Sequence, residues 1–175
     1  MKAIKTAAKQ QLKQQGFNLV ELLLTLIIAS FLMGYALPSY QRMIEQQTQR
    51  SELARLQAVL NHARLMATMN NKKLQVCASS NGQQCDASAF LSGNLLIITD
   101  DNQQVVHFSV GNGYPIVFNS PTIGINPLPK QSLGGTLLPC TGFSRIEPKG
   151  VTVSAVSRVR VNDKISATLK ALCPN

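Results

Sequence analysis

The chain has 175 residues, with 17 lysines and arginines against eight acidic residues and a net charge of +9. A short basic N-terminal segment and one long apolar run occupy its first 37 positions. The remaining length leaves room for one small globular domain and excludes a second domain of ordinary size.

The first sixteen residues are basic and have no apolar core. They contain Lys2, Lys5, Lys9 and Lys13, and they lack the small-residue cleavage motif of a secretory signal peptide. By the positive-inside rule, these lysines favour a cytoplasmic N-terminus.

The run from Phe17 to Leu37 predicts a helix that crosses a membrane. It has 21 residues and one charge, Glu21. About 20 apolar residues in a helix cross a hydrocarbon core about 30 Å thick, and a helix satisfies its own backbone in lipid. Residues 17–38 would therefore anchor the chain in a membrane. The C-terminal domain would lie on the side away from the lysines, in a compartment that permits disulfides.

Glu21 is unusual because a carboxylate near the centre of a membrane helix costs about 2.5–3.5 kcal/mol, and less near an end. Two interpretations stay open. The side chain reaches water at the interface, or it meets a positive group, such as an N-terminal amine, on a neighbouring chain.

Helical character continues through residues 39–71. This segment is rich in good helix formers, and its apolar residues recur at spacings of three and four: Leu53, Leu56, Leu60, Ala63 and Ala67. We expect one amphipathic helix that ends at Asn70-Asn71 and presents this stripe to a sheet. Pro38 predicts a kink in that helix; the alternative is a second helix that begins with Pro38 in its first turn.

Residues 72–175 alternate short β-branched runs with turn residues, which predicts a β-rich domain. The expected fold class is α+β, with a long N-terminal helix packed on a C-terminal antiparallel sheet. Asp100-Asp101-Asn102 predicts a solvated hairpin turn rather than a calcium site, and Asn119–Gln131, with three prolines, an irregular loop or sheet edge. The candidate strands are Lys73–Ala78, Leu95–Thr99, Val105–Val110, Ile116–Phe118, Gly142–Glu147, Val151–Val156, Arg158–Val161 and Ile165–Leu172.

The four cysteines, Cys77, Cys85, Cys140 and Cys173, predict structural disulfides, and four cysteines permit three pairings. Pairing Cys77 with Cys85 would close a short loop, whereas pairing Cys140 with Cys173 would join the C-terminus to an internal strand. The second bond would stabilise more, because it closes the longer loop. No C-x-x-C spacing is present, which argues against a redox motif or zinc site.

The sequence contains none of the common catalytic, phosphate-binding or metal-binding motifs. It predicts no enzyme activity, no cofactor and no metal, and it favours a structural or binding protein. The two histidines are isolated in sequence. We expect His62 to be a polar residue on a helix face, and His107, which alternates with Val106 and Phe108, to face solvent from a strand.

Positive charge concentrates at the C-terminus, where residues 130–175 hold seven basic residues and two acidic ones. Arg158 and Arg160 alternate on a predicted strand and so point to the same face. Arginine presents a planar fork to phosphate, and such a patch can contact DNA without reading its sequence. Lys164, Arg145 and Lys149 extend the candidate DNA-binding set by charge alone. The alternative is a solvated surface, or one that meets acidic groups on neighbouring subunits.

The N-terminal features together resemble a type IV prepilin. A basic segment ending in Gly16 is followed by Phe17, then Glu21, the apolar run and Pro38; the same signature marks pseudopilins of type II secretion. The resemblance implies that residues 1–16 are a leader, that a prepilin peptidase cleaves after Gly16 and methylates Phe17, and that Glu21 docks onto a neighbouring subunit. Pro38 lies where the family has its helix-kinking proline.

The C-terminal sequence Ser157-Arg158-Val159-Arg160 is similar to the Gly-Arg-x-Arg pattern of the GspH/FimT/FimU family of minor pilins and pseudopilins. In FimT-like members these arginines bind DNA during natural transformation. Ser157 replaces the glycine, so only the two arginines carry over.

The resemblance implies the type IV pilin fold and a minor pilin that assembles with other pilins in a filament, at its priming complex or tip. It also implies contact with double-stranded DNA. The alternatives are a GspH-type pseudopilin that caps the periplasmic pseudopilus of type II secretion, and a single-span membrane enzyme, against which the missing catalytic motifs weigh.

Overall fold

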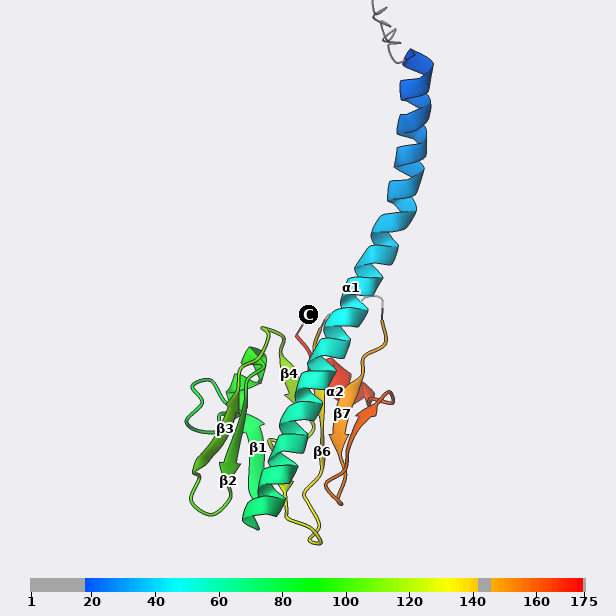
Figure 1. The fold of residues 1–175 in the computed structure, drawn as a ribbon. Coiled ribbons are helices and arrows are strands. Elements are labelled where there is room, and N and C mark those ends of the chain that lie inside the picture. The colour runs from blue at the N-terminus through cyan, green and yellow to red at the C-terminus, as the bar shows by residue number, and fades with distance from the viewer. Residues whose placement is uncertain (1–17, 142–145, 175) are drawn as a thin grey trace, which may run out of the picture. The chain divides into compact units, whose positions relative to one another are not determined.

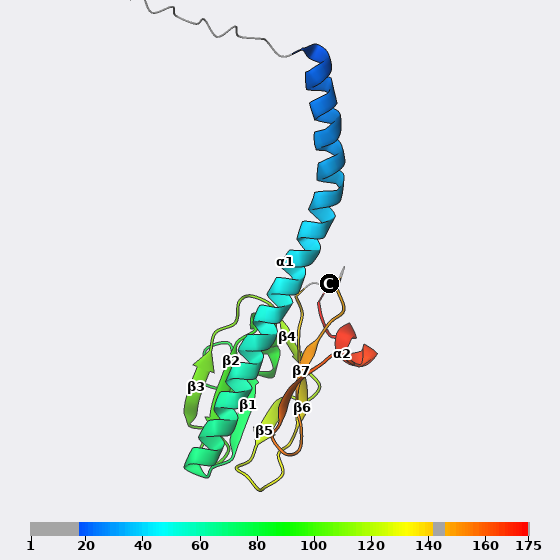
Figure 2. The ribbon, with the colours of Figure 1, turned by 45° about the vertical axis from the view of Figure 1, so that its right-hand side comes forward.

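The computed structural model describes residues 18–141 and 146–174. Contacts within the chain divide it into two units, one ending at Tyr40 and the other beginning at Gln41. Helix α1 (Leu19–Asn70) continues from the first unit into the second, where it packs on the β-strands (Figures 1 and 2).

The first part of α1 is an exposed apolar helix. The Asn18 side-chain oxygen accepts a hydrogen bond from the Val20 backbone N–H at 3.3 Å, as at a helix N-cap. Glu21 lies in the first turn, where the helix dipole favours a negative charge. In length and composition, α1 can cross a membrane.

Helix α1 is not interrupted at Pro38. The interpretation in which a second helix begins at that proline is therefore wrong. The expected end of the helix is confirmed: Asn71 follows it with φ = 49°, a left-handed conformation that often terminates helices, and Lys72 N–H bonds the Ala67 carbonyl at 3.1 Å.

The β-rich unit contains two antiparallel four-stranded sheets. The first has the order β3-β2-β1-β5 and the second β4-β6-β7-β8. The strands of the first sheet are β1 (Leu74–Ala78), β2 (Leu95–Thr99), β3 (Val105–Ser109) and β5 (Thr122–Ile125). Those of the second are β4 (Ile116–Phe118), β6 (Gly135–Pro139), β7 (Gly150–Val153) and β8 (Val159–Asn162). Two short helices complete the unit, η1 (Ala87–Ser92) and α2 (Ala167–Ala171).

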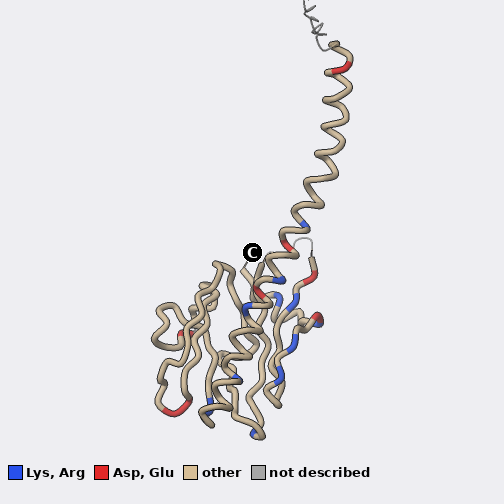
Figure 3. The backbone as a smooth tube through the Cα atoms, viewed as in Figure 1, with Lys and Arg blue, Asp and Glu red and all other residues tan. Residues whose placement is uncertain are grey.

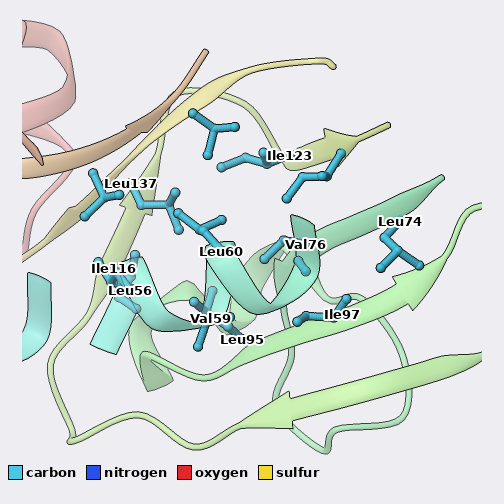
Figure 4. Packing of buried hydrophobic residues seen from close by; sticks show 14 of the residues in the cluster. Leu56, Val59, Leu60, Leu74, Val76, Leu95, Ile97, Ile116, Ile123 and Leu137 are labelled. Carbon is cyan, nitrogen blue, oxygen red and sulfur yellow. The ribbon is translucent and has the colours of Figure 1, made fainter. Parts of the chain in front are cut away.

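The apolar stripe of α1 forms the centre of the core, as its periodicity predicts. All five predicted stripe residues are buried, and Leu56 and Leu60 have no exposed surface. They contact buried residues from both sheets, among them Val76 of β1 and Leu137 of β6 (Figure 4). The helix thus holds the two sheets together through one continuous apolar cluster.

The expected strand at Ile165–Leu172 is wrong, because α2 occupies most of that range. The Ser166 hydroxyl accepts a hydrogen bond from Leu169 N–H at 3.3 Å and caps the helix. The buried residues Ile165 and Leu169 are four positions apart, a helical spacing, and they pack against Val117 and Leu138 on the outer face of the second sheet.

Two of the observed strands fall outside the candidate strands. The edge strand β5 occurs within the proline-rich Asn119–Gln131 segment, in agreement with the expected sheet edge. Strand β6 is central in the second sheet. The candidate strand Gly142–Glu147 falls mostly outside the described residues, and its last two residues are not in a strand.

All four cysteines form disulfides, which confirms the structural role predicted for them. Cys77 pairs with Cys85, and Cys140 pairs with Cys173. The first bond lies in a small apolar cluster on the outer face of the first sheet. The second connects the end of β6 to the segment after α2.

A buried ion pair on α1 links the helix to the first sheet. Glu52 is 1% exposed and lies 3.0 Å from the guanidinium of Arg55. Arg55 also donates to the Gly93 carbonyl at 3.0 Å and to the Ser109 hydroxyl at 3.3 Å. The Asn112 amide donates to the second oxygen of Glu52. One acid and one cation thereby hold two segments against the helix: Gly93, which follows η1, and the end of β3 with the loop after it.

We predict that Arg55→Met lowers the free energy of unfolding by about 3–5 kcal/mol, because it leaves the Glu52 carboxylate buried without its cation. Adding Glu52→Gln to that variant should restore part of the loss. Arg50→Met, an exposed position on the same helix, should change stability by less than about 0.5 kcal/mol. Urea unfolding of the full chain in detergent measures all three; equal losses for Arg55→Met and Arg50→Met would contradict the prediction.

Candidate nucleic-acid interface

The predicted cationic pair lies on the β7–β8 hairpin, which has one apolar and one polar face. Val151 and Val153 of β7 are buried in the core beneath α1. Their neighbour Thr152 lies opposite Arg160 in the register of the two strands. Because side chains alternate across a strand, Arg160 points away from the core. Figure 3 shows that Lys and Arg residues follow one another along this side of the unit.

Arg158 extends the same ladder by one residue pair. Its carbonyl accepts a hydrogen bond from Ser154 N–H at 3.0 Å, and its N–H donates to the Ser154 hydroxyl at 3.2 Å. It therefore lies two positions from Arg160 on the same face, and both side chains are exposed. Arg158 itself precedes β8, because the predicted strand Arg158–Val161 starts one residue before the observed one.

Hydroxyl groups, not carboxylates, surround this pair across the strands. Thr152 bonds Thr136 of β6 through their hydroxyls at 3.0 Å, and Asn162 donates to Thr152 at 3.5 Å. Within the described ranges, no ion pair involves Arg158 or Arg160. The two guanidiniums thus keep their positive charge uncompensated beside neutral hydrogen-bonding groups, which suits an anionic oxygen-rich partner.

Ser157, immediately before the pair, has the backbone conformation that a glycine adopts freely. Its φ is +58°, in the left-handed region that is costly for residues with a side chain. The side chain is fully buried. Its hydroxyl bonds that of Ser132 and donates to the Asn126 carbonyl at 3.5 Å. These contacts hold the turn in place although the family pattern has Gly here.

The remaining residues predicted by charge do not join this pair equally. Lys164 is exposed and lies two residues after the end of β8. Lys149 is bound to Asp163, with 3.3 Å between ammonium and carboxylate. Arg145 lies outside the described residues. Arg158 and Arg160 therefore form the centre of the candidate interface, and Lys149 contributes little net charge to it.

Lys149 instead lines a hollow with two arginines of α1. Arg42 and Arg50 approach it from the helix, beside Gln49, whose amide donates to the Glu147 carbonyl at 2.9 Å. The sequence did not reveal this second cluster, because about 100 positions separate its two halves. In the sequence, this cluster could have been suggested only by the spacing of Arg42 and Arg50 on the helix.

The positions predicted for processing and docking lie apart from this surface. Gly16 and Phe17 are outside the described residues. Glu21 and Pro38 are exposed positions on α1. The disulfide cysteines are structural.

Both acidic residues of the turn Asp100-Asp101-Asn102 form ion pairs with lysines, which supports the predicted solvated turn. Lys73 lies 2.9 Å from Asp100, and Lys72 lies 3.5 Å from Asp101. Hydrogen bonds from Lys73 and then Gln75 lower the pKa of Asp100 below its usual value. Throughout the described ranges, no cluster of three or more His, Cys, Asp or Glu side chains is placed to hold a metal.

Comparison with known proteins identifies the fold. No family model and no curated protein matches the sequence. A crystal structure of the type IV minor pilin FimU from Pseudomonas aeruginosa PAO1, in space group P21, is similar over 69% of this chain and 92% of that chain, with a TM-score of 0.51 and 13% identity. The P65 crystal form covers 65% of this chain and 91% of that one, with a TM-score of 0.49 and 13% identity. The chain therefore has the type IV pilin fold that FimU exemplifies.

We predict that Ser157→Ala destabilises the protein more than Ser157→Gly, by about 1 kcal/mol. Both changes remove the buried hydroxyl and its hydrogen bonds, a loss of about 0.5–1.5 kcal/mol. Glycine also relieves the strain of the left-handed backbone, whereas alanine retains it. Urea unfolding of the two variants measures the difference. A glycine variant as unstable as the alanine variant, or less stable, would contradict this account of the turn.

Proposed function

We propose that the protein is a minor type IV pilin whose helix α1 packs into a filament with the helices of other pilins. The observation that carries the proposal is the continuity of α1. One uninterrupted helix joins an exposed apolar segment of membrane-spanning length to the core of a domain with the FimU fold. Such a segment exposes far more apolar surface than a soluble domain tolerates. It would therefore be buried in the membrane before assembly and against the helices of other pilins in the filament.

The subunit is first a single-span protein of the inner membrane, with its β-rich domain in the periplasm. A prepilin peptidase removes residues 1–16 after Gly16 and methylates Phe17. Glu21 then docks onto the N-terminus of a neighbouring subunit. Its position supports this role: it lies in the first turn of α1, close to the end of the helix that cleavage exposes. The protein takes its place at the priming complex or tip of the pilus.

We predict that Glu21→Ala leaves membrane insertion intact but reduces incorporation into filaments at least several-fold. The carboxylate has no basic partner within its own helix, and its removal makes the span more apolar. Insertion is measured by membrane flotation, and incorporation by immunoblotting of sheared filaments. Thr25→Ala, one turn further along the exposed helix, is the matched control and should assemble normally. Unchanged assembly of Glu21→Ala would favour the interpretation that Glu21 only reaches interfacial water.

A second proposed activity is the binding of double-stranded DNA by Arg158 and Arg160, as natural transformation would need. Its support is the exposed pair of guanidiniums on one face, flanked by the hydroxyls of Thr152 and Ser154. Phosphate contacts of this kind bind without sequence preference and weaken with salt. Base stacking would need aromatic side chains beside the arginines. Tyr114 lines a hollow beside α1 instead, and Phe143 lies outside the described residues. Backbone contact with a duplex is therefore the mode we propose.

We predict that Arg158→Gln with Arg160→Gln weakens duplex binding at least tenfold in low salt. The slope of log affinity against log salt should become shallower by about 2, because about one counterion is released for each phosphate contact. Fluorescence anisotropy with the full chain in detergent measures both quantities.

The matched control removes two positive charges elsewhere, through Arg64→Gln with Lys130→Gln. If this control weakens binding as much as the hairpin variant, attraction arises from net charge and the assignment to Arg158 and Arg160 fails. Equal binding by the wild type and the hairpin variant would also overturn it.

A further inference from the structure

The only two histidines of the chain meet in the folded protein. His62 lies on α1 and His107 on β3, 45 positions later. Their ring centroids are 5.0 Å apart, and the rings are inclined at 64° in an edge-to-face arrangement. The two residues are isolated in the sequence, and the proposed function uses neither of them.

A β-bulge explains why His107 turns toward the helix. In the pairing of β2 with β3, Ile97 lies opposite His107 but Ile98 lies opposite Val105, so Val106 is an extra residue. Val106 packs against the core, whereas Phe108 packs on the other face, next to the Cys77–Cys85 disulfide. The simple alternation expected for Val106, His107 and Phe108 is therefore wrong. Bulges commonly re-aim side chains in this manner.

The imidazole nitrogens of this pair are available to a ligand. Neither ring donates or accepts a hydrogen bond to any residue in the described part of the chain. His107 is exposed and His62 is half-buried, so solvent reaches the pair. Arg55, seven residues before His62 on α1, is ion-paired with Glu52. The site therefore offers solvent-accessible nitrogen donors that have no hydrogen-bond partner in the described part of the chain.

The separation of the rings suits two imidazoles bound to one metal ion. A metal–nitrogen bond is about 2.0–2.1 Å long. Two imidazoles in adjacent coordination positions then have centroids about 4.5–5 Å apart, when the bond length is combined with the size of the ring. The observed 5.0 Å agrees with that range.

We propose that His62 and His107 form an exchangeable site for a divalent transition-metal ion of the kind that prefers imidazole: zinc, nickel or copper. With two protein ligands, water or a donor from another molecule fills the remaining positions. A metal there ties the C-terminal part of α1 to the edge strand β3. Because it binds the folded state, it stabilises the domain by mass action. The inference is independent of the pilin assignment.

The test is titration of the untagged full chain in detergent with Zn²⁺ and Ni²⁺. The expected results are one equivalent bound per chain, a metal-dependent rise in Tm, and changes in the NMR ring signals of both histidines. Assignment is direct, because the chain has two histidines and its four cysteines are in disulfides.

Two single variants, His62→Gln and His107→Gln, should each lower the affinity at least tenfold. Arg64→Gln, a neighbouring position on α1, is the matched control and should bind normally. Circular dichroism verifies that the variants are folded, and His107 is an exposed edge position whose replacement leaves the core intact. Binding that survives either histidine variant, or that depends on only one histidine, would overturn the proposal, as would a Tm that metal does not change.

Discussion

The structure depends on the burial of one helix stripe between two sheets. Leu56 and Leu60 of α1 have no exposed surface, and they contact strands of both sheets (Figure 4). Each fully buried leucine contributes about 1.5–3 kcal/mol relative to an exposed one. The sheets are small, and each has an apolar inner face that would be exposed to solvent without the helix. The domain is stable because α1 covers both faces at once.

The same helix also carries the features on which assembly is proposed to depend. Its N-terminal part is apolar and exposed, whereas its C-terminal part is the centre of a folded core. Helix α1 includes both parts, with Pro38 inside it. The segment proposed for assembly and the core of the domain therefore belong to one secondary-structure element.

The candidate interface depends on the core in a similar way. Val151 and Val153 fix the inward face of β7, and the strand register then determines which residues of β8 point outward. Arg158 and Arg160 are therefore displayed by apolar packing on the opposite face. Ser157 completes the arrangement by holding a left-handed turn through its buried hydroxyl.

The sequence predicted the elements whose signal is local and long. Strands β2 and β4 lie at the predicted residues, and the helix ends where Asn70-Asn71 suggests. Short elements were harder to predict. Strand β6 begins next to Gly134. In a sequence, a glycine suggests the end of a strand, but here it lets the backbone of residue 134 approach Val153 on β7 closely. The segment around α2 contains too few residues to distinguish a period of two from one of 3.6.

By itself, the sequence predicted the apolar run, the buried stripe of α1 and the structural role of the cysteines. Each of these follows from side-chain periodicity or residue type within a few turns of chain. Only the tertiary structure decided which cysteines pair, that Lys149 meets Asp163, and that His62 meets His107. These contacts join residues far apart in the chain, and they depend on strand order, register and a single bulge, none of which leaves a local pattern in the sequence.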